Sequence, residues 1–234
     1  MDPQKLSAWA KEYQSRRAEG EPGWTTPDSY QHKQQVLEEA LACNPVPAGG
    51  RFLELGCGAG NVTQWMATKG FHSHGIDIVP AAIEWARSRE TGESNVAPAF
   101  HLGNITNMNE FPEGIFDIVF DGDCLHMVMG TERPRSFAEI RRVLKTGGLF
   151  VAGGNVRDES YRVQTEPVIG KTGFDASTHI IWRDGRQEYL LQSERELASE
   201  IEAAGFEIAR TLRWPKRGRS AFVLDCVAFH AIAR

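Results

Sequence analysis

The sequence predicts an α/β fold: a doubly wound, mostly parallel, seven-stranded sheet that ends in an antiparallel hairpin, with an N-terminal helical lid. Three observations support this prediction. From residue 51 onward, short aliphatic segments alternate with amphipathic ones, and a glycine-rich loop follows the first aliphatic segment. The last two such segments are separated only by Pro215–Ser220. Alternating strands and helices pair in parallel through right-handed crossovers, whereas so short a loop can only join antiparallel strands.

Length and composition favour a single domain with additions. The chain has 234 residues, of which 41% are hydrophobic and 24% charged, as in ordinary globular proteins. No apolar run approaches the ~20 residues of a membrane-spanning helix, and Met1–Lys5 lacks the apolar core of a secretory signal. The net charge of −5 argues against a protein held on nucleic acid by bulk electrostatics. The four cysteines lack a paired spacing, so we expect a reduced, cytoplasmic protein.

Residues 1–50 differ in character from the rest and predict the lid. They are polar, and helices are expected over 4–18 and 28–43, with the turn-rich Gly20–Gly23 between them. A proline at its start and Asn44-Pro45 after its end delimit the second helix.

The segment 51–154 carries the alternation of strands and helices. Strands are expected over 51–55, 72–77, 96–102, 115–120 and 149–152. Helices are expected near 60–69 and over 80–90 and 131–145, the last of them ended by Gly147-Gly148.

After residue 154 the alternation stops. Residues 155–192 mix charged and aromatic side chains and predict an irregular insertion on the substrate side. Ser193, followed by Glu196 three residues later, has the capping-box pattern and starts a helix that reaches Ala204.

Strands over 207–214 and 222–231 then form the closing hairpin. We therefore expect two units, the lid over 1–50 and a main domain over 51–234 that contains the insertion.

A glycine-rich loop after the first strand, Glu54–Asn61, is the clearest binding motif. Glycines let a backbone approach a ligand closely, and the helix that follows presents free N–H groups. Asp77 ends the next strand, where a carboxylate can accept hydrogen bonds from both hydroxyls of a ribose. Asn61 stands where a dinucleotide fingerprint has its third glycine, and Glu54 disfavours a pyrophosphate but suits an ammonium or sulfonium group. The loop therefore indicates a nucleoside that carries an amino acid.

Five segments together resemble the class I S-adenosylmethionine-dependent methyltransferases, and most of all their small-molecule group: Glu54–Asn61, Gly75–Ile78, Gly103–Ile105, Phe116–Val128 and Arg142–Gly148. The resemblance covers residues 51–154 and, in topology, 193–231. It implies that the chain binds S-adenosylmethionine, with the glycines against the methionine portion, Glu54 at the ammonium group and Asp77 at the ribose. The positions it implies for cofactor binding are Glu54, Gly56, Cys57, Gly58, Gly60, Asp77, Ile78, Asn104, Ile105 and Asp121. Asn104 departs from the aspartate usual in the family, although its carbonyl can still face the adenine amino group.

The acceptor side is expected where Phe120–His126 leaves the fourth strand. By the resemblance, the backbone of Asp121 lies beside the reacting methyl group. His126 is the best candidate for a general base, which a hydroxyl or thiol acceptor needs; the alternative is a packed helical residue. Two carboxylates and one histidine on a single turn are too few for a metal site, so none is expected. Cys124 lacks the preceding proline of enzymes that methylate cytosine through a cysteine.

Aromatic residues in the first thirty positions and in the insertion are candidates for the walls of the site. In this family such a leader often folds over the cofactor cleft, where aromatic rings can face a sulfonium. The candidates are Tyr13, Trp24 and Tyr30 in the lid and Trp182 in the insertion, with Trp9, Tyr161 and Tyr189 as neighbours. The alternative is that the N-terminal aromatic side chains only bury a helix against the domain.

We therefore expect a cytoplasmic enzyme that transfers a methyl group from S-adenosylmethionine to a small molecule by direct in-line displacement. An RNA or protein methyltransferase, a non-catalytic regulator that binds S-adenosylmethionine, and a nucleotide-dependent oxidoreductase remain as alternatives. The feature that favours RNA is a basic cluster around the hairpin, Arg210, Arg213, Lys216, Arg217 and Arg219. The acidic balance of the whole chain argues against nucleic acid, and the lack of a long apolar run argues against a membrane partner.

Overall fold

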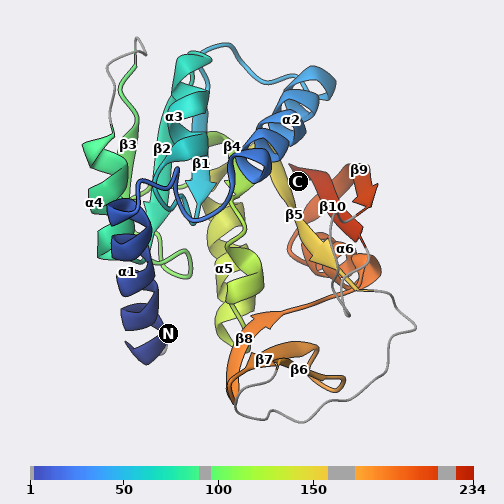
Figure 1. Cartoon of the computed structure of the whole chain (residues 1–234). Helices are drawn as coiled ribbons and strands as arrows, with labels where there is room; N and C mark the ends of the chain where they lie inside the picture. Colours follow the sequence, from blue (N-terminus) through green and yellow to red (C-terminus); the bar gives the residue numbers. More distant parts are fainter. Residues whose placement is uncertain (1–2, 90–95, 158–171, 216–224) are drawn as a thin grey trace.

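The computed structural model describes residues 3–89, 96–157, 172–215 and 225–234 (Figure 1). Its main sheet has seven strands in the order β3-β2-β1-β4-β5-β10-β9, which confirms the predicted fold class. The first four pairings are parallel, and β10 is antiparallel to both of its neighbours. The strands are β1 Arg51–Leu55, β2 His72–Asp77, β3 Ala99–Leu102, β4 Phe116–Asp121, β5 Leu144–Val156, β9 Phe206–Pro215 and β10 Asp225–Ala233.

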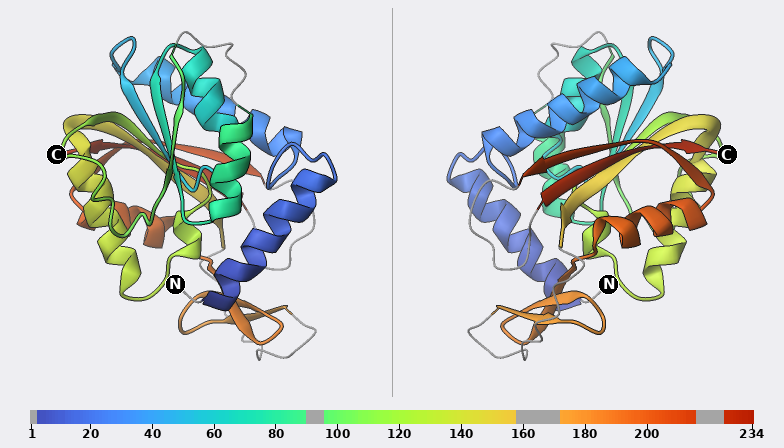
Figure 2. Two further views of the ribbon diagram at one scale, coloured as in Figure 1. Left: turned by 90° about the vertical axis from the view of Figure 1, so that its left-hand side faces the viewer. Right: turned by 90° about the vertical axis from the view of Figure 1, so that its right-hand side faces the viewer.

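Helices cover both faces of this sheet (Figure 2). They are α1 Pro3–Ala18, α2 Pro27–Cys43, α3 Asn61–Thr68, α4 Pro80–Ser88, α5 Glu132–Val143 and α6 Glu194–Ala203, with a 3₁₀ turn, η1, at Leu125–Met127. Side chains alternate along a strand, so neighbouring residues of β1 serve different layers. Phe52 packs with α2 and α3, whereas Leu53 packs with α5 and α6. No helix among the described residues is long and apolar enough to cross a membrane.

The two N-terminal helices begin within one residue of the positions predicted from the sequence. Thr26 is the N-cap of α2, and its side chain accepts a hydrogen bond from Ser29 N at 3.4 Å. One side of α1 packs on α4 through Tyr13 and Trp85. The same helix reaches toward the strands of the insertion at its N-terminal end (Figure 1).

The prediction of an irregular insertion over 155–192 is wrong. A separate antiparallel sheet forms there, with β6 at Thr172–Asp175, β7 at Ile180–Arg183 and β8 at Arg186–Leu190. Asp184 and Gly185 both have positive φ, of 52° and 74°, and join β7 to β8. Asp-Gly is the sequence preferred in such two-residue hairpins, so this pair was a usable signal.

The fifth strand is longer than predicted, and the helix before it ends earlier. The strand was expected over 149–152, but β5 continues through Gly153 and Gly154 to Val156. A Cβ atom at Gly153 would lie 2.1 Å from the carbonyl oxygen of Val227, so this glycine permits the close approach of β10. In the hairpin, β9 and β10 are antiparallel as predicted; the residues between them, 216–224, lie outside the described residues, as does Tyr161.

Candidate functional site

A cavity of about 410 Å³ opens at the carboxyl edge of the parallel strands, where ligands bind in folds of this type. Its wall includes most of the predicted site residues: Tyr13, Trp24, Tyr30, Glu54, Gly56, Cys57, Gly58, Asp77, Ile78, Asn104, Ile105, Asp121 and His126. Gly60 and Trp182 do not line it. Gly60 is the N-cap of α3, and a Cβ there would lie 2.7 Å from the ring of Phe100. In the insertion sheet, Tyr189 and Leu190 of β8 line the cavity.

The glycine loop fits closely between two other parts of the wall. Gly56 and Gly58 have positive φ, of 67° and 53°, a region that favours glycine. A Cβ at Gly56 would lie 2.7 Å from Cβ of Cys124, and one at Gly58 would lie 3.0 Å from the hydroxyl of Tyr13. The loop thus contacts the turn after β4 on one side and α1 on the other.

Asp77 is buried at the end of β2 and holds two loops together. Its Oδ2 accepts a hydrogen bond from Gly58 N, and its Oδ1 accepts one from Val79 N, each at 2.9 Å. Burial raises the pKa of this carboxyl, and the backbone hydrogen bonds only partly offset that effect. Each carboxylate oxygen retains a lone pair, so Asp77 can still accept hydrogen bonds from a ligand.

Glu54 lies on β1 beneath the glycine loop and is 3% exposed. Its Oε2 accepts hydrogen bonds from the backbone N, at 2.9 Å, and the hydroxyl of Thr63. Burial raises the pKa of Glu54 to about 7, against the opposing effects of Thr63 and Lys33. A cation bound in the cavity would therefore stabilise its charged form.

Asp121 directs one carboxylate oxygen into the turn that follows β4. Its Oδ1 accepts hydrogen bonds from Cys124 N at 2.8 Å and Leu125 N at 3.0 Å. Burial raises the pKa of Asp121 to about 6. These two hydrogen bonds stabilise the start of η1, the turn that carries His126.

His126 projects from η1 against the insertion sheet. Its ring meets that of Tyr189 edge to face, with centroids 5.6 Å apart and an interplanar angle of 88°. Burial lowers the pKa of His126, while the nearby Asp123 opposes the shift. Burial therefore favours the neutral imidazole, the form that can accept a proton.

Lys33 and Gln192 also line the cavity, although no pattern in the sequence indicated either residue. Lys33 of α2 forms an ion pair with Asp123, and its Nζ donates a hydrogen bond to the carbonyl of Gly122 at 3.1 Å. Asp123 has a φ of 67°, which is uncommon for a residue other than glycine. Partial desolvation would raise the pKa of Asp123, whose side chain is half-exposed, but Lys33 and His126 hold that pKa below its ordinary value.

The aromatic residues of the N-terminal segment pack over the glycine loop. The rings of Tyr13 and Trp24 lie 4.8 Å apart, and Tyr13 also meets Trp85 at 6.4 Å. The hydroxyl of Tyr30 accepts a hydrogen bond from Thr25 N at 3.3 Å. At the far end of α1, the Nζ of Lys5 donates to backbone carbonyls of β8, so this helix spans from the glycine loop to the insertion.

Asn104 lies on the loop after β3 and uses its side chain locally. Its Oδ1 accepts a hydrogen bond from Thr106 N at 3.0 Å. A carbonyl oxygen has a second lone pair, so the predicted contact with a ligand amino group is compatible with this turn.

Comparisons with known proteins agree on the type of domain. Residues 53–152 match a family model described as "Methyltransferase domain". The chain is 28% identical over 176 residues to an uncharacterized methyltransferase of Synechocystis, a match that covers 75% of this chain and 74% of the relative. It is 37% identical over 168 residues to an uncharacterized methyltransferase of Schizosaccharomyces pombe, covering 67% of this chain and 58% of the relative.

A solved structure extends the likeness in fold to the whole chain. It is that of 1,6-didemethyltoxoflavin-N1-methyltransferase of Burkholderia thailandensis with bound 1,6-didemethyltoxoflavin and S-adenosylhomocysteine. The TM-score is 0.64 at 19% sequence identity, and the match covers 100% of this chain and 92% of the other.

Proposed function

Because the chain belongs to the class I S-adenosylmethionine-dependent methyltransferases, we propose that it methylates a small-molecule acceptor by direct in-line displacement. When bound, S-adenosylmethionine supplies an electrophilic methyl group. The protein has to hold the donor, align the acceptor, exclude water and, for a hydroxyl acceptor, remove a proton.

The charges of the cavity suit a cationic donor. Among the described residues that line it, carboxyl groups outnumber lysines and arginines: Glu54, Asp77, Asp121 and Asp123 stand against Lys33 alone. Burial raises the pKa of Glu54 and of Asp77, so a bound sulfonium and ammonium would stabilise their charged forms. In our proposal, Glu54 serves the ammonium group, Asp77 the ribose, and Gly56 and Gly58 the methionine portion.

The acceptor is proposed to bind between η1, β8 and α1. The wall here is largely apolar or aromatic, with a few polar groups: Trp9, Tyr30, Met127, Tyr189, Leu190 and Leu191 beside Lys33, Asp123 and His126. Such a composition is typical of a site for a small organic molecule. The lid over 1–50 would cover this site and keep water from it.

The electrostatics favour a small molecule over RNA. Arg210 pairs with Glu39, and Arg213 pairs with Glu194, so both basic side chains are engaged within the protein. Lys216, Arg217 and Arg219 lie outside the described residues. An excess of carboxyl groups in the cavity also disfavours a phosphate-bearing acceptor.

His126 is proposed as the general base, and the position of its imidazole in the cavity wall beside Tyr189 is the observation that supports this role. Burial lowers the pKa of His126 and so favours the neutral form that a base requires. The acceptor oxygen would form a bond with the methyl carbon as the carbon–sulfur bond breaks, and the hydroxyl proton would pass to a ring nitrogen of His126. Demethylated donor then leaves. An amine acceptor, already nucleophilic when neutral, would depend less on this histidine.

Incubation with deuteromethyl-labelled S-adenosylmethionine tests the proposal. Three substrate pools should be compared by mass spectrometry: a metabolite extract below about 1 kDa, total RNA and total protein. We expect label in the metabolite pool, with loss of that label in the Asp77→Ala variant. Label confined to RNA or protein would contradict the small-molecule acceptor. Donor binding without product in any pool would favour the non-catalytic regulator instead.

A further inference from the structure

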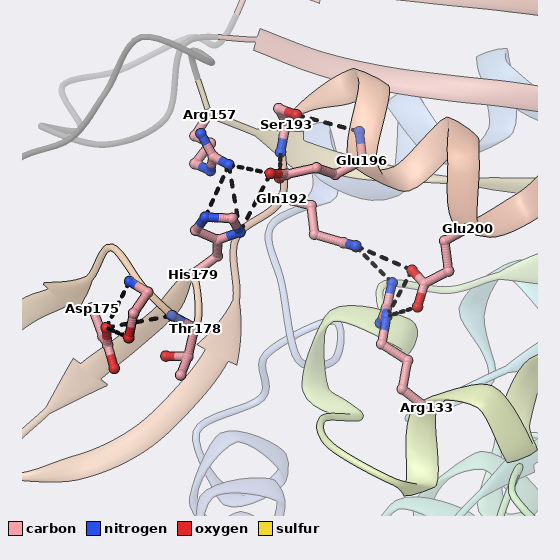
Figure 3. Close-up of polar contacts among 10 residues, drawn as sticks. Arg133, Arg157, Asp175, Thr178, His179, Gln192, Ser193, Glu196 and Glu200 are labelled. Atoms are coloured by element: carbon pink, nitrogen blue, oxygen red, sulfur yellow. Dashed lines mark hydrogen bonds and ion pairs between the residues drawn. The ribbon is translucent and has the colours of Figure 1, made fainter.

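Arg133 lies on α5 behind the wall of the acceptor cavity and is 5% exposed. Its Nε donates to both carboxylate oxygens of Glu200, at 2.7 and 2.8 Å, and its Nη2 donates to Oε1 of Gln192 at 2.7 Å (Figure 3). Gln192 in turn donates through Nε2 to Glu200 at 3.1 Å. Three elements thus meet at one guanidinium group: α5, α6 and the last residues of the insertion.

The remaining nitrogen of Arg133 binds the turn that carries His126. Nη1 donates to the carbonyl of Leu125 and, at 3.3 Å, to that of Val128. These two carbonyls stand on either side of His126 and Met127. A planar guanidinium presents its donors in a fixed fork, so it can fix this turn in orientation as well as in distance.

The same arginine reaches the other side of the acceptor cavity through Gln192. This residue follows β8, three positions after Tyr189, whose ring packs against His126 at 5.6 Å. A second anchor lies beside it: Arg157 pairs with Glu196, contacts His179 of the insertion, and donates from its backbone N to the carbonyl of Gln192 at 2.9 Å (Figure 3). The insertion is therefore fixed to α6 next to the point where Arg133 holds it.

We propose that Arg133 is a positioning residue of the acceptor site, which sets the placement of His126 through the turn and of Tyr189 through Gln192. This inference rests on the proposed function of His126 as the base. A contribution to stability does not by itself explain a buried arginine at this position, because a buried ion pair can often be replaced by apolar residues without loss of stability. What an arginine adds is directional control of two walls of one cavity.

The charges around His126 provide an independent readout. Four charged side chains influence the pKa of His126: Asp123 after β4, Lys33 of α2, Arg133 of α5 and Lys5 of α1. Burial lowers its pKa first, Asp123 opposes that shift, and the three cations add to it. Loss of the Arg133 charge, or exposure of the turn, should therefore raise the pKa of His126.

Arg133→Gln, Arg133→Lys and Gln192→Leu test the proposal, with Arg135→Gln as the matched control. Arg135 is on the same helix, its side chain is 67% exposed, and it pairs only with Glu132 in the described contacts. The amides of Met127 and Val128, which donate within the turn to Cys124 and Leu125, report its opening by hydrogen exchange. The His126 ring reports its environment by NMR titration. Neither measurement needs an identified acceptor.

In Arg133→Gln we expect these two amides to exchange roughly tenfold faster or more, since hydrogen bonds to a charged group are lost. The pKa of His126 should rise in Arg133→Gln and rise less in Arg133→Lys, which keeps the charge without the fork. Gln192→Leu should give an intermediate exchange rate and should fold even if Arg133→Gln does not. Affinity for S-adenosylhomocysteine should stay within about twofold, because Asp77 and the glycine loop are untouched.

Unchanged exchange of the turn and an unchanged His126 titration in the folded variants would overturn the proposal. A uniform increase in exchange across the chain would also overturn it, in favour of a general stabilising role. A separate experiment tests the proposed role of His126 as the base. If that role is wrong, the His126→Gln variant will retain methyl transfer, whatever the hydrogen exchange of the Arg133 variants shows.

Discussion

Lys33 and Asp123 form an ion pair, with Nζ 2.9 Å from Oδ2, that joins the N-terminal helices to the acceptor side of the sheet. The lysine lies on α2 and is largely buried, whereas the aspartate lies in the loop after β4 in a left-handed conformation. The same Nζ binds the carbonyl of Gly122. The Lys33 side chain therefore links the position of α2 at the cavity to the conformation of the loop after β4.

Replacement of Lys33 by Met should lower the free energy of unfolding by about 1–2 kcal/mol, because the ammonium group loses its hydrogen bond to the Gly122 carbonyl and its pairing with the half-exposed Asp123. The pKa of Asp123 should rise toward its ordinary value. Lys69→Met is the matched control. Lys69 follows α3 and forms an exposed ion pair with Glu38 of α2, the helix that also carries Lys33. That control should change stability by less than about 1 kcal/mol. Equal effects of the two substitutions in denaturant titrations would contradict the link between α2 and the loop.

Asp77→Asn should weaken binding of S-adenosylhomocysteine by about 1–3 kcal/mol in calorimetry. An amide has one acceptor oxygen where the carboxylate has two, so it cannot serve Gly58 N, Val79 N and a ribose together. The Asp28→Asn variant, with its substitution in the exposed first turn of α2, controls for the change in net charge. If the affinity of a folded Asp77→Asn variant equals that of the wild type, the ribose role is wrong.

The sequence was sufficient for the main sheet because its signals are local. Glycines between a strand and a helix, aliphatic segments of strand length and the Ser193–Glu196 capping box each determine the backbone nearby; that box is present, with Glu196 N donating to Ser193 Oγ at 3.3 Å. The proposed donor side follows from the same signals, because parallel strands bring their carboxyl ends to one edge of the sheet.

The proposed acceptor side was less predictable, because its contacts join residues far apart in the sequence. In the sequence, Lys33 is indistinguishable from any other polar residue of a helix. Its role becomes visible only in the fold, where α2 packs against the loop that carries Asp123. Gln192 lies between β8 and α6, and Arg133 of α5, far away in the sequence, binds its side chain. The insertion strands are short and mixed in polarity, so periodicity could not reveal them, and only Asp184-Gly185 marked a hairpin.

His126→Gln should reduce turnover roughly 10²–10⁴-fold for a hydroxyl acceptor while affinity for the donor stays intact. Since the pKa of His126 is lowered, its neutral form persists below the ordinary value of 6.5. The rate constant kcat/KM should thus be flat near neutrality and fall only at more acidic pH, once the imidazole becomes protonated. His72→Gln, at an exposed position on β2, is the control. Retained turnover in His126→Gln would show that the histidine only packs against Tyr189.

Stability should decrease in mild acid because of two histidines remote from the cavity. His74 of β2 and His101 of β3 share a hydrogen bond, Nδ1 to Nε2, at 3.1 Å, and both rings pack on Phe111. Burial, followed by the neighbouring His101, lowers the pKa of His74 to about 4. The unfolded chain binds protons near pH 6.5 and the folded one does not, so this contribution is complete above pH 6.5 and is lost as the pH falls to about 4.

The His74→Gln variant should show a smaller loss of stability between pH 7 and pH 4.5 than the wild type in urea titrations, even if it is less stable at pH 7. His72→Gln, at an exposed position on the same strand, provides the comparison. The decisive quantity is the slope of the unfolding free energy with pH, because a packing defect shifts the whole curve without changing that slope. Identical slopes for His74→Gln and wild type would show that the pair does not titrate with unfolding.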